Sequence, residues 1–218
     1  TYKVQAYSFK DGMQVALQHF EQTVTYNTTV TGLFNIYNLT AAISSVHMLT
    51  KEPLQNICDA VENFAGVSGR METISMDPFI VVDFAHTPDG MKEVLKSYPS
   101  KDIIVVFGAG GDRDKEKRPL MGRVAFHYAK HIIVTSDNPR FEDPDLIIQD
   151  ILSGIPSHEN VEVDVNRKTA INKALNLASK NSVILILGKG DEEYQTIYDK
   201  KFPLNDKDIV LKALVNYK

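Results

Sequence analysis

Hydrophobic and polar residues follow two different patterns along the chain, and the change lies near residue 68. Over residues 1–34 they alternate, as in the segments 4–9 and 23–26. A period of two is typical of strands with one buried face, and Asp11-Gly12 supplies turn residues. We therefore predict antiparallel strands or hairpins in this first part of the chain.

Two helices are expected after these strands. The second covers about 53–64 and opens with Pro53 in its first turn, where a missing amide proton costs nothing. The segment 66–69, Gly-Val-Ser-Gly, is a flexible joint and marks the domain boundary, giving domains 1–67 and 68–218. The first helix, over about 36–49, is predicted by apolar residues at helical spacing: Ile36, Leu39, Ile43, Val46 and Leu49.

From about residue 68, short apolar runs alternate with helical segments. Thr87-Pro88 and Asp143-Pro144 each place a capping side chain before a proline at the first helical position. The alternation predicts an α/β fold, with a Rossmann-like, mostly parallel sheet and helices on both faces. The expected strands are 79–84, 103–107, 132–136, 161–165 and 183–187, and the expected helices lie near 88–97, 119–130, 144–152, 167–180 and from about Asp206.

Composition and charge exclude several classes of function. The chain has 218 residues, 43% hydrophobic and 24% charged, which is ordinary for a soluble globular protein. A net charge of −4 with no basic stripe argues against nucleic-acid binding, and no apolar run is long enough to cross a membrane. The single cysteine, Cys58, fits a reducing compartment, so we expect a cytoplasmic protein. We also expect a monomer. The start at Thr1, without an initiator methionine, suggests a piece of a longer protein, although a processed chain would look the same.

Four of the predicted strands end in polar or glycine-rich loops, at 83–88, 108–114, 136–140 and 188–192. In a parallel sheet these loops share one edge, which is where open α/β sheets bind ligands. Together they would bring arginines, an asparagine, a carboxylate and open backbone to one place. We therefore predict a site for a zwitterion, a molecule with both carboxylate and ammonium groups.

Other chemistries fit the same loops less well. The glycines from Gly108 on fail the dinucleotide-binding spacing because the third position is Arg113, and no phosphate-binding P-loop is present. Asp83 and His86 have no further ligand at metal-binding spacing, so we expect no metal site made by protein groups alone. For the Asp137–Arg140 turn by itself, a solvated strand exit is as good an interpretation as a binding site.

Several motifs resemble those of the Mur ligases. The resemblance covers nearly the whole chain, and its most specific part is the Gly110-Gly111-Asp112-Arg113-Asp114 block. It implies that residues 1–67 are the α+β tail of a central ATPase domain and that 68–218 bind the amino acid. The motifs are Gly32 to Ala42, Gly69 to Glu72, Asp83 to Pro88, Gly110 to Met121, Asp137 to Arg140 and Gly188 to Glu192.

The resemblance also implies a reaction. Mur ligases use ATP and Mg²⁺ to activate a carboxylate of a nucleotide-linked muramoyl peptide as an acyl phosphate, which the amine of an amino acid then attacks. The form of residues 137–140 resembles the branch that joins meso-diaminopimelate to UDP-MurNAc-L-Ala-D-Glu. Lysine has no second carboxylate for Arg140 to bind, which agrees with this choice.

The site residues follow from the same resemblance. Arg113, Asn138 and Arg140, with Asp137 beside them, would bind the side-chain carboxylate of diaminopimelate. Gly188 and Glu192 would bind the neighbouring ammonium group. Nucleotide contacts would come from Asn38, Arg70, Asp83 and, with less support, His86.

One substitution and one absence limit the resemblance. Asp191 stands where the family usually has histidine, and the phosphate loop, the magnesium ligands and the modified lysine of the family would lie upstream of this chain. We therefore expect no catalytic residue in this chain and no activity of the fragment alone. Alternatives are a lysine-adding Mur ligase, a folylpolyglutamate synthase-like ligase, or a Rossmann-like binding module without catalytic duty.

Overall fold

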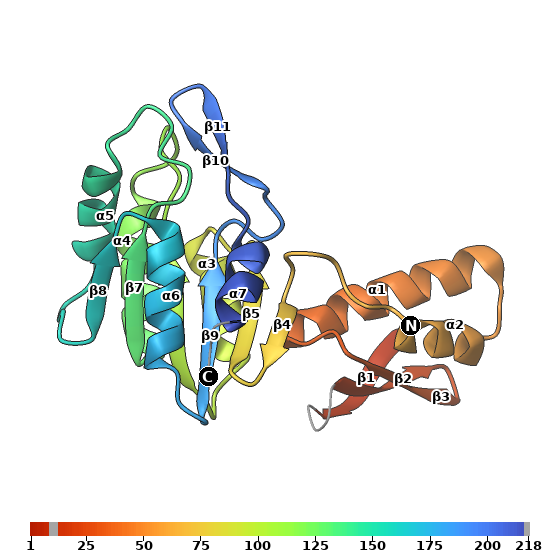
Figure 1. Cartoon of the computed structure of the whole chain (residues 1–218). Helices are drawn as coiled ribbons and strands as arrows, with labels where there is room; N and C mark the ends of the chain where they lie inside the picture. Colours follow the sequence, from red (N-terminus) through yellow and green to blue (C-terminus); the bar gives the residue numbers. More distant parts are fainter. Residues whose placement is uncertain (9–12, 216–218) are drawn as a thin grey trace. The chain divides into compact units, whose positions relative to one another are not determined.

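The computed structural model describes residues 1–8 and 13–215. The chain divides into two compact units, residues 1–67 and 68–218 (Figure 1). The turn expected at Asp11-Gly12 falls outside the described residues.

The first unit contains an antiparallel sheet and two helices. Strands β1 (Tyr2–Ser8), β2 (Met13–His19) and β3 (Gln22–Thr28) lie in sequence order. The alternation along β2 buries Met13, Val15 and Leu17, so these side chains face the core, as a period of two requires. The predicted strand and helix types are therefore present in this part of the chain.

The helices of the first unit are α1 (Leu33–Thr50) and α2 (Leu54–Glu62). Pro53 lies at the N-cap of α2, one position before the first turn where it was expected. In α1 the apolar stripe is buried only in its first half: Ile36, Leu39 and Ile43 pack in the core, whereas Val46 and Leu49 are exposed.

The second unit is built on a six-stranded sheet with the order β4-β5-β9-β6-β7-β8. The strands from β5 to β8 are parallel and β4 runs antiparallel to β5, which confirms the predicted mostly parallel sheet. Strand β4 was not predicted. The bounds are β4 Glu72–Met76, β5 Phe79–Asp83, β6 Asp102–Phe107, β7 His131–Thr135, β8 Val161–Asp164 and β9 Ser182–Leu187.

Helices cover both faces of this sheet, with α6 and α7 on one face and α3, α4 and α5 on the other (Figure 1). Thr87 and Asp143 cap α3 and α5 as predicted, because their side chains accept bonds from the amides of Gly90 (3.1 Å) and Asp145 (2.9 Å). The bounds are α3 Pro88–Lys96, α4 Lys117–Tyr128, α5 Pro144–Leu152, α6 Arg167–Leu177 and α7 Asp206–Leu214.

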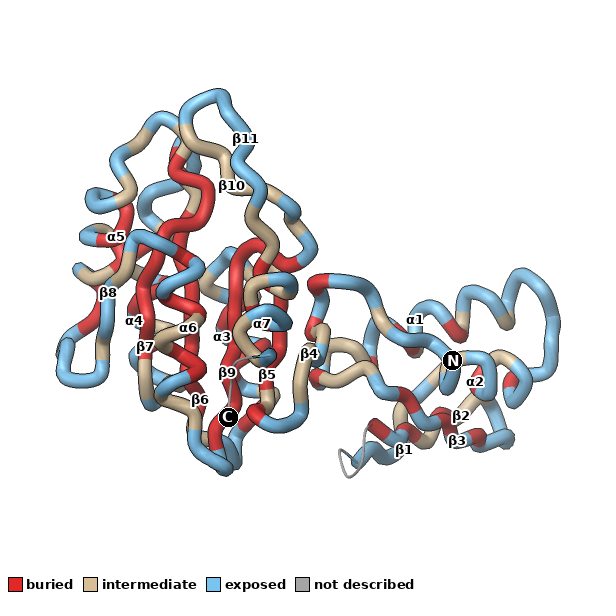
Figure 2. The backbone as a smooth tube through the Cα atoms, in the orientation of Figure 1, coloured by how far each residue is buried: buried red, intermediate tan, exposed pale blue. Residues whose placement is uncertain are grey.

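Two features of the second unit matter for the site. Strand β9, the last in sequence of the six, lies between β5 and β6, so four consecutive strands of the sheet, β5-β9-β6-β7, end in the polar loops. These strands are buried along most of their length (Figure 2). A small hairpin of β10 (Tyr194–Ile197) and β11 (Lys200–Pro203), which was not predicted, follows β9.

Candidate binding site at the carboxyl ends of the strands

The four polar loops meet at a cleft of about 290 Å³ in the second unit. Every lining residue follows the carboxyl end of β5, β9, β6 or β7, as expected for ligand sites in open parallel sheets. The lining includes seven of the predicted site residues. It consists of Phe84, His86, Gly110, Arg113, Lys117, Asp137, Asn138, Arg140, Gly188 and Glu192.

A hydrogen-bonded group of three side chains forms one wall of this cleft. The Nδ2 of Asn138 donates to Oε2 of Glu192 at 2.8 Å. The Nζ of Lys189, a fully buried residue, donates to the same oxygen at 2.6 Å and to Oδ1 of Asn138 at 3.1 Å. Lys189 was not among the predicted site residues, because as a lysine between two glycines it gave no sign of being buried.

Glu192 is held as a carboxylate by these neighbours. Burial alone would raise its pKa, but the hydrogen bonds from Lys189 and Asn138 outweigh burial, and the pKa lies below its ordinary value. Both side-chain bonds fall on Oε2. The other oxygen, Oε1, accepts neither of them and is available to an ammonium group of a ligand.

Arg140 has an unusual backbone conformation, with φ of 51°. The hairpin fixes it on both sides, because the amide of Arg140 donates to Thr196 O at 3.1 Å and the amide of Tyr198 donates to Arg140 O at 2.7 Å. Its Nη1 donates to Gly111 O at 2.8 Å. Arg140 lines the cleft, and a guanidinium group can bind a carboxylate through two donors.

Asp137 and Gly188 lie against each other in the lining of the cleft. Asp137 is 7% exposed, and its Oδ1 accepts a bond from the amide of Asn138 at 2.6 Å. Gly188 has φ of +114°, and a Cβ added there would lie 2.7 Å from Oδ2 of Asp137. Only glycine fits this position without strain, so its backbone can approach a ligand closely.

Two further cations, Arg113 and Lys117, line the cleft. Arg113 is exposed and lines the cleft, with its Nη1 donating to Asp112 O at 3.1 Å. Lys117, which was not predicted, donates from Nζ to His86 O at 3.1 Å. Burial lowers the pKa of Lys117, although the neighbouring carboxylates of Asp114 and Asp137 oppose that effect.

Arg118, although it belongs to the same charged segment, serves the fold. It is fully buried, and its guanidinium group binds Glu142 through two bonds of 2.9 and 3.0 Å and Asp150 through one of 2.8 Å. Its Nη2 also donates to Gly110 O at 3.3 Å, so this buried arginine also holds the glycine-rich loop.

The predicted nucleotide contacts divide into different environments. Arg70 is exposed, with its guanidinium carbon 4.3 Å from the ring centre of Phe84. His86 lines the cleft, and its Nδ1 lies 2.9 Å from Phe84 O. Asp83 is buried, and its two oxygens accept bonds from the amides of Met71 (2.8 Å) and Ala85 (2.7 Å). Burial raises the pKa of Asp83 despite those two bonds. Because its oxygens accept from both amides, this side chain organises the loop that follows β5.

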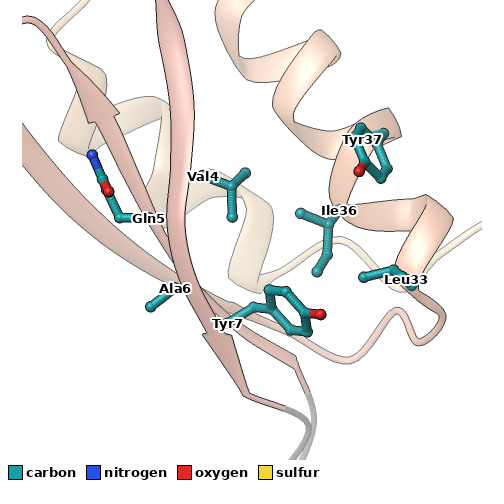
Figure 3. Close-up of a pocket in the computed structure, with 7 residues that line it drawn as sticks. All are labelled: Val4, Gln5, Ala6, Tyr7, Leu33, Ile36 and Tyr37. Atoms are coloured by element: carbon teal, nitrogen blue, oxygen red, sulfur yellow. The ribbon is translucent and has the colours of Figure 1, made fainter.

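Asn38 lies in the first unit and is exposed on α1, where its Nδ2 donates to Oδ1 of Asn35 at 3.0 Å. A separate hollow of the same unit lies between β1 and α1 (Figure 3). Its lining is apolar and aromatic with one amide side chain, and it does not include Asn38: Val4, Gln5, Ala6, Tyr7, Leu33, Ile36 and Tyr37.

Two absences bear on other classes of site. Among residues 1–8 and 13–215, no group of three or more histidine, cysteine, aspartate or glutamate side chains is arranged to hold a metal ion. No helix of the described part of the chain is long and apolar enough to cross a membrane.

Fold and cleft together define an α/β domain with a polar cleft at the carboxyl edge of a mostly parallel sheet. Residues 69–190 match the glutamate ligase domain of the Mur ligases. Because this match covers more than half of the chain, the chain belongs to the Mur ligase family.

Individual relatives agree with this assignment. The chain is 48% identical over 98% of its length to "UDP-N-acetylmuramoyl-L-alanyl-D-glutamate--2,6-diaminopimelate ligase" of Wolinella succinogenes and 44% identical over 99% to the protein of the same name from Helicobacter pylori. It spans about half the length of these relatives, 49% and 50%.

Solved structures show the same fold. A structure of a UDP-N-acetylmuramoyl-L-alanyl-D-glutamate--2,6-diaminopimelate ligase aligns over 99% of this chain and 45% of its own, with a TM-score of 0.71 and 34% identity. A folylpolyglutamate synthase of Mycobacterium tuberculosis, 19% identical, aligns over 86% of this chain and 45% of its own with a TM-score of 0.71, and it shares the fold.

Proposed function

We propose that this chain is the amino-acid-binding part of a ligase that joins meso-diaminopimelate to UDP-MurNAc-L-Ala-D-Glu in peptidoglycan synthesis. Residues 68–218 would be the amino-acid-binding domain, and residues 1–67 the end of the central ATP-binding domain. The enzyme would act in the cytoplasm as a monomer. The observation that carries the proposal is the cleft itself, which places Arg140 and Arg113 beside the Asn138–Glu192 pair.

Each residue of the cleft has a task in this proposal. Arg140 and Arg113 bind the carboxylate at the side-chain end of the amino acid, with Asn138 and Asp137 fixing the loop between them. Glu192 and the backbone of Gly188 bind the ammonium group at the same end. The amine at the opposite end of the amino acid then stays free of these residues and can attack the acyl phosphate.

ATP and Mg²⁺ supply the activation of the acceptor carboxylate in this family, and this chain contributes only part of their site. The exposed guanidinium group of Arg70 can bind a phosphate, and it lies over the ring of Phe84. His86 belongs to the same loop as Phe84. These two residues therefore fit a nucleotide. Asp83, whose oxygens are bound to backbone amides, would position that loop.

The test is the amino-acid specificity of the full-length protein that carries this chain. With ATP, Mg²⁺ and UDP-MurNAc-L-Ala-D-Glu present, meso-diaminopimelate should be used with a kcat/KM at least about a hundredfold higher than lysine, because lysine leaves the arginines of the cleft without a carboxylate. Better use of lysine would contradict the proposed substrate. Use of neither, with glutamate accepted on a folate instead, would indicate the folylpolyglutamate synthase-like reaction.

A further inference from the structure

Lys189 is a buried charge in the wall of the cleft. The proposed function assigns no role to this residue. Its side chain is fully buried, and burying an ammonium group is costly unless partners compensate for the lost water. Its two side-chain partners are Asn138 and Glu192, both of them residues of the cleft. The cation is therefore placed at the site and does not serve a remote part of the core.

We propose that Lys189 is a positioning residue for the amino-acid substrate, which holds Asn138 in one orientation and presents the Glu192 carboxylate to the substrate's ammonium group. The inference rests on the proposed function in that the ligand is taken to be an amino acid. It adds a residue that acts on amino-acid binding through Asn138 and Glu192.

The orientation of Asn138 follows from the donors around it. Its Oδ1 accepts from Lys189 Nζ at 3.1 Å and from the amide of Thr196 at 2.8 Å. A flipped amide would place the Nδ2 hydrogens against both donors. The two donors therefore direct Nδ2 of Asn138 to Glu192, where the bond is 2.8 Å.

The position of Glu192 follows in the same way. Lys189 and Asn138 bind the same oxygen, Oε2, and this arrangement fixes the plane of the carboxylate. Oε1 accepts neither bond, and Glu192 lines the cleft. A ligand ammonium group can then bind an oxygen whose direction was set before the ligand arrived, which reduces the entropy lost on binding.

The charge of Lys189 matters as well as its geometry. Four groups from different elements act on the Glu192 carboxylate: Lys189 and Asn138 through hydrogen bonds, and Arg140 and the buried Arg167 through charge. Lys189 is the nearest of the cations, at 2.6 Å. Without it, Glu192 would lose its main stabilising partner and would take up a proton at higher pH.

The experiment compares Lys189→Met and Lys189→Gln with the wild type in the full-length enzyme. Met removes charge and donor, whereas Gln keeps one donor and removes the charge. We expect the KM for meso-diaminopimelate to rise about tenfold to a hundredfold in Lys189→Met and less in Lys189→Gln. The KM for UDP-MurNAc-L-Ala-D-Glu and kcat at saturation should change by less than about threefold. In both variants the acidic limb of 1/KM for the amino acid should move to higher pH.

A matched control is Lys130→Met. Lys130 also binds a carboxylate, that of Asp102 at 3.0 Å, but this pair lies at the end of the strands opposite the cleft. The control variant should leave both KM values and the pH profile unchanged. An unmoved acidic limb, an equal rise in the KM of both substrates, or loss of folding in both Lys189 variants would overturn the proposal, because Lys189 would then serve only the fold.

The two proposals fail in different ways. If the wild type does not use meso-diaminopimelate, the proposed function is wrong, and the same series measured with the amino acid that is used still tests Lys189. If the wild type uses meso-diaminopimelate and the Lys189 variants behave as the wild type, only the inference on Lys189 is wrong.

Discussion

Asn138 and Glu192 are 54 positions apart in the chain, and a 2.8 Å hydrogen bond joins their side chains. Asn138 follows β7 and Glu192 follows β9, and β6 lies between these strands in the sheet. The glycine-rich exit of β6 is packed closely against the loop that holds Asn138. A Cβ at Gly111 would lie 1.9 Å from Pro139 O, and one at Gly108 would lie 2.2 Å from Thr135 O. These glycines are therefore required by the neighbouring loop.

The replacement Arg140→Ala should chiefly weaken use of the amino acid. The guanidinium group lines the cleft, and loss of a charge-assisted bidentate contact costs about 2–4 kcal/mol, which corresponds to about a tenfold to thousandfold loss in kcat/KM for meso-diaminopimelate. Steady-state kinetics of the full-length enzyme measures this. Arg123→Ala, which removes an exposed arginine of α4 outside the cleft, is the control and should behave as the wild type. An unchanged apparent affinity of Arg140→Ala for meso-diaminopimelate would contradict the assigned role.

Replacement of Gln195, in strand β10 of the hairpin, should also weaken binding of the amino acid. Its Nε2 donates to Asp137 O at 2.6 Å and to Ser136 Oγ at 3.2 Å, so it holds the loop that carries Asn138 and Arg140. Gln195→Met keeps the size of the side chain and removes both donors. The KM for meso-diaminopimelate should rise about fivefold to tenfold, as expected for the loss of a neutral hydrogen bond that positions a binding loop. A change confined to the KM of the nucleotide substrate would show that the hairpin serves another site.

Much of the second unit could be predicted from its sequence because its strands are fully buried and its helices carry clear caps. Continuous apolar runs mark such strands, and Thr87 and Asp143 mark helix starts by a mechanism that acts within a few residues. That four polar loops share one edge follows from parallel pairing alone. The seven predicted residues that line the cleft were found in this way and from the family's motifs.

The remaining features depend on contacts between distant parts of the chain. The insertion of β9 between β5 and β6 is a choice of strand order that no local pattern encodes. Strands β10 and β11 have four residues each and are half-buried or exposed, so they show no clear period. Lys189 and Arg118 are residue types that usually lie on a solvated surface. Their burial depends on partners elsewhere in the chain, such as Glu142, 24 positions from Arg118. Asp83 shows the converse case, a motif carboxylate turned inward to backbone amides.

Stability should depend strongly on the fully buried pair of Arg167 and Asp206. Nε and Nη2 of Arg167 donate to the two oxygens of Asp206 at 2.8 and 2.7 Å, and both side chains are completely buried. Asp206→Ala leaves an uncompensated buried charge and should lower the free energy of unfolding by about 3–5 kcal/mol. Urea denaturation measures the loss. The double variant Arg167→Met/Asp206→Leu should recover much of the lost stability, because it leaves no unpaired charge in the core. If the double variant is no more stable than Asp206→Ala, lost packing and not the buried charge causes the destabilisation.

Glu142 should make stability depend on acid pH. Hydrogen bonds from Arg118, with further help from the amide of Asp112 and from Lys115, lower the pKa of Glu142 from 4.5 to about 2. Because the pKa is lower in the folded state, the stabilisation is fully present above about pH 4.5 and is lost as the pH falls toward about 2. The urea midpoint of Glu142→Gln should therefore lie below that of the wild type at neutral pH, and the gap should close between these two values. Glu159→Gln, which also removes a carboxylate but at an exposed position, is the matched control. A gap for Glu142→Gln that stays constant down to pH 2 would mean that the charge of Glu142 contributes nothing.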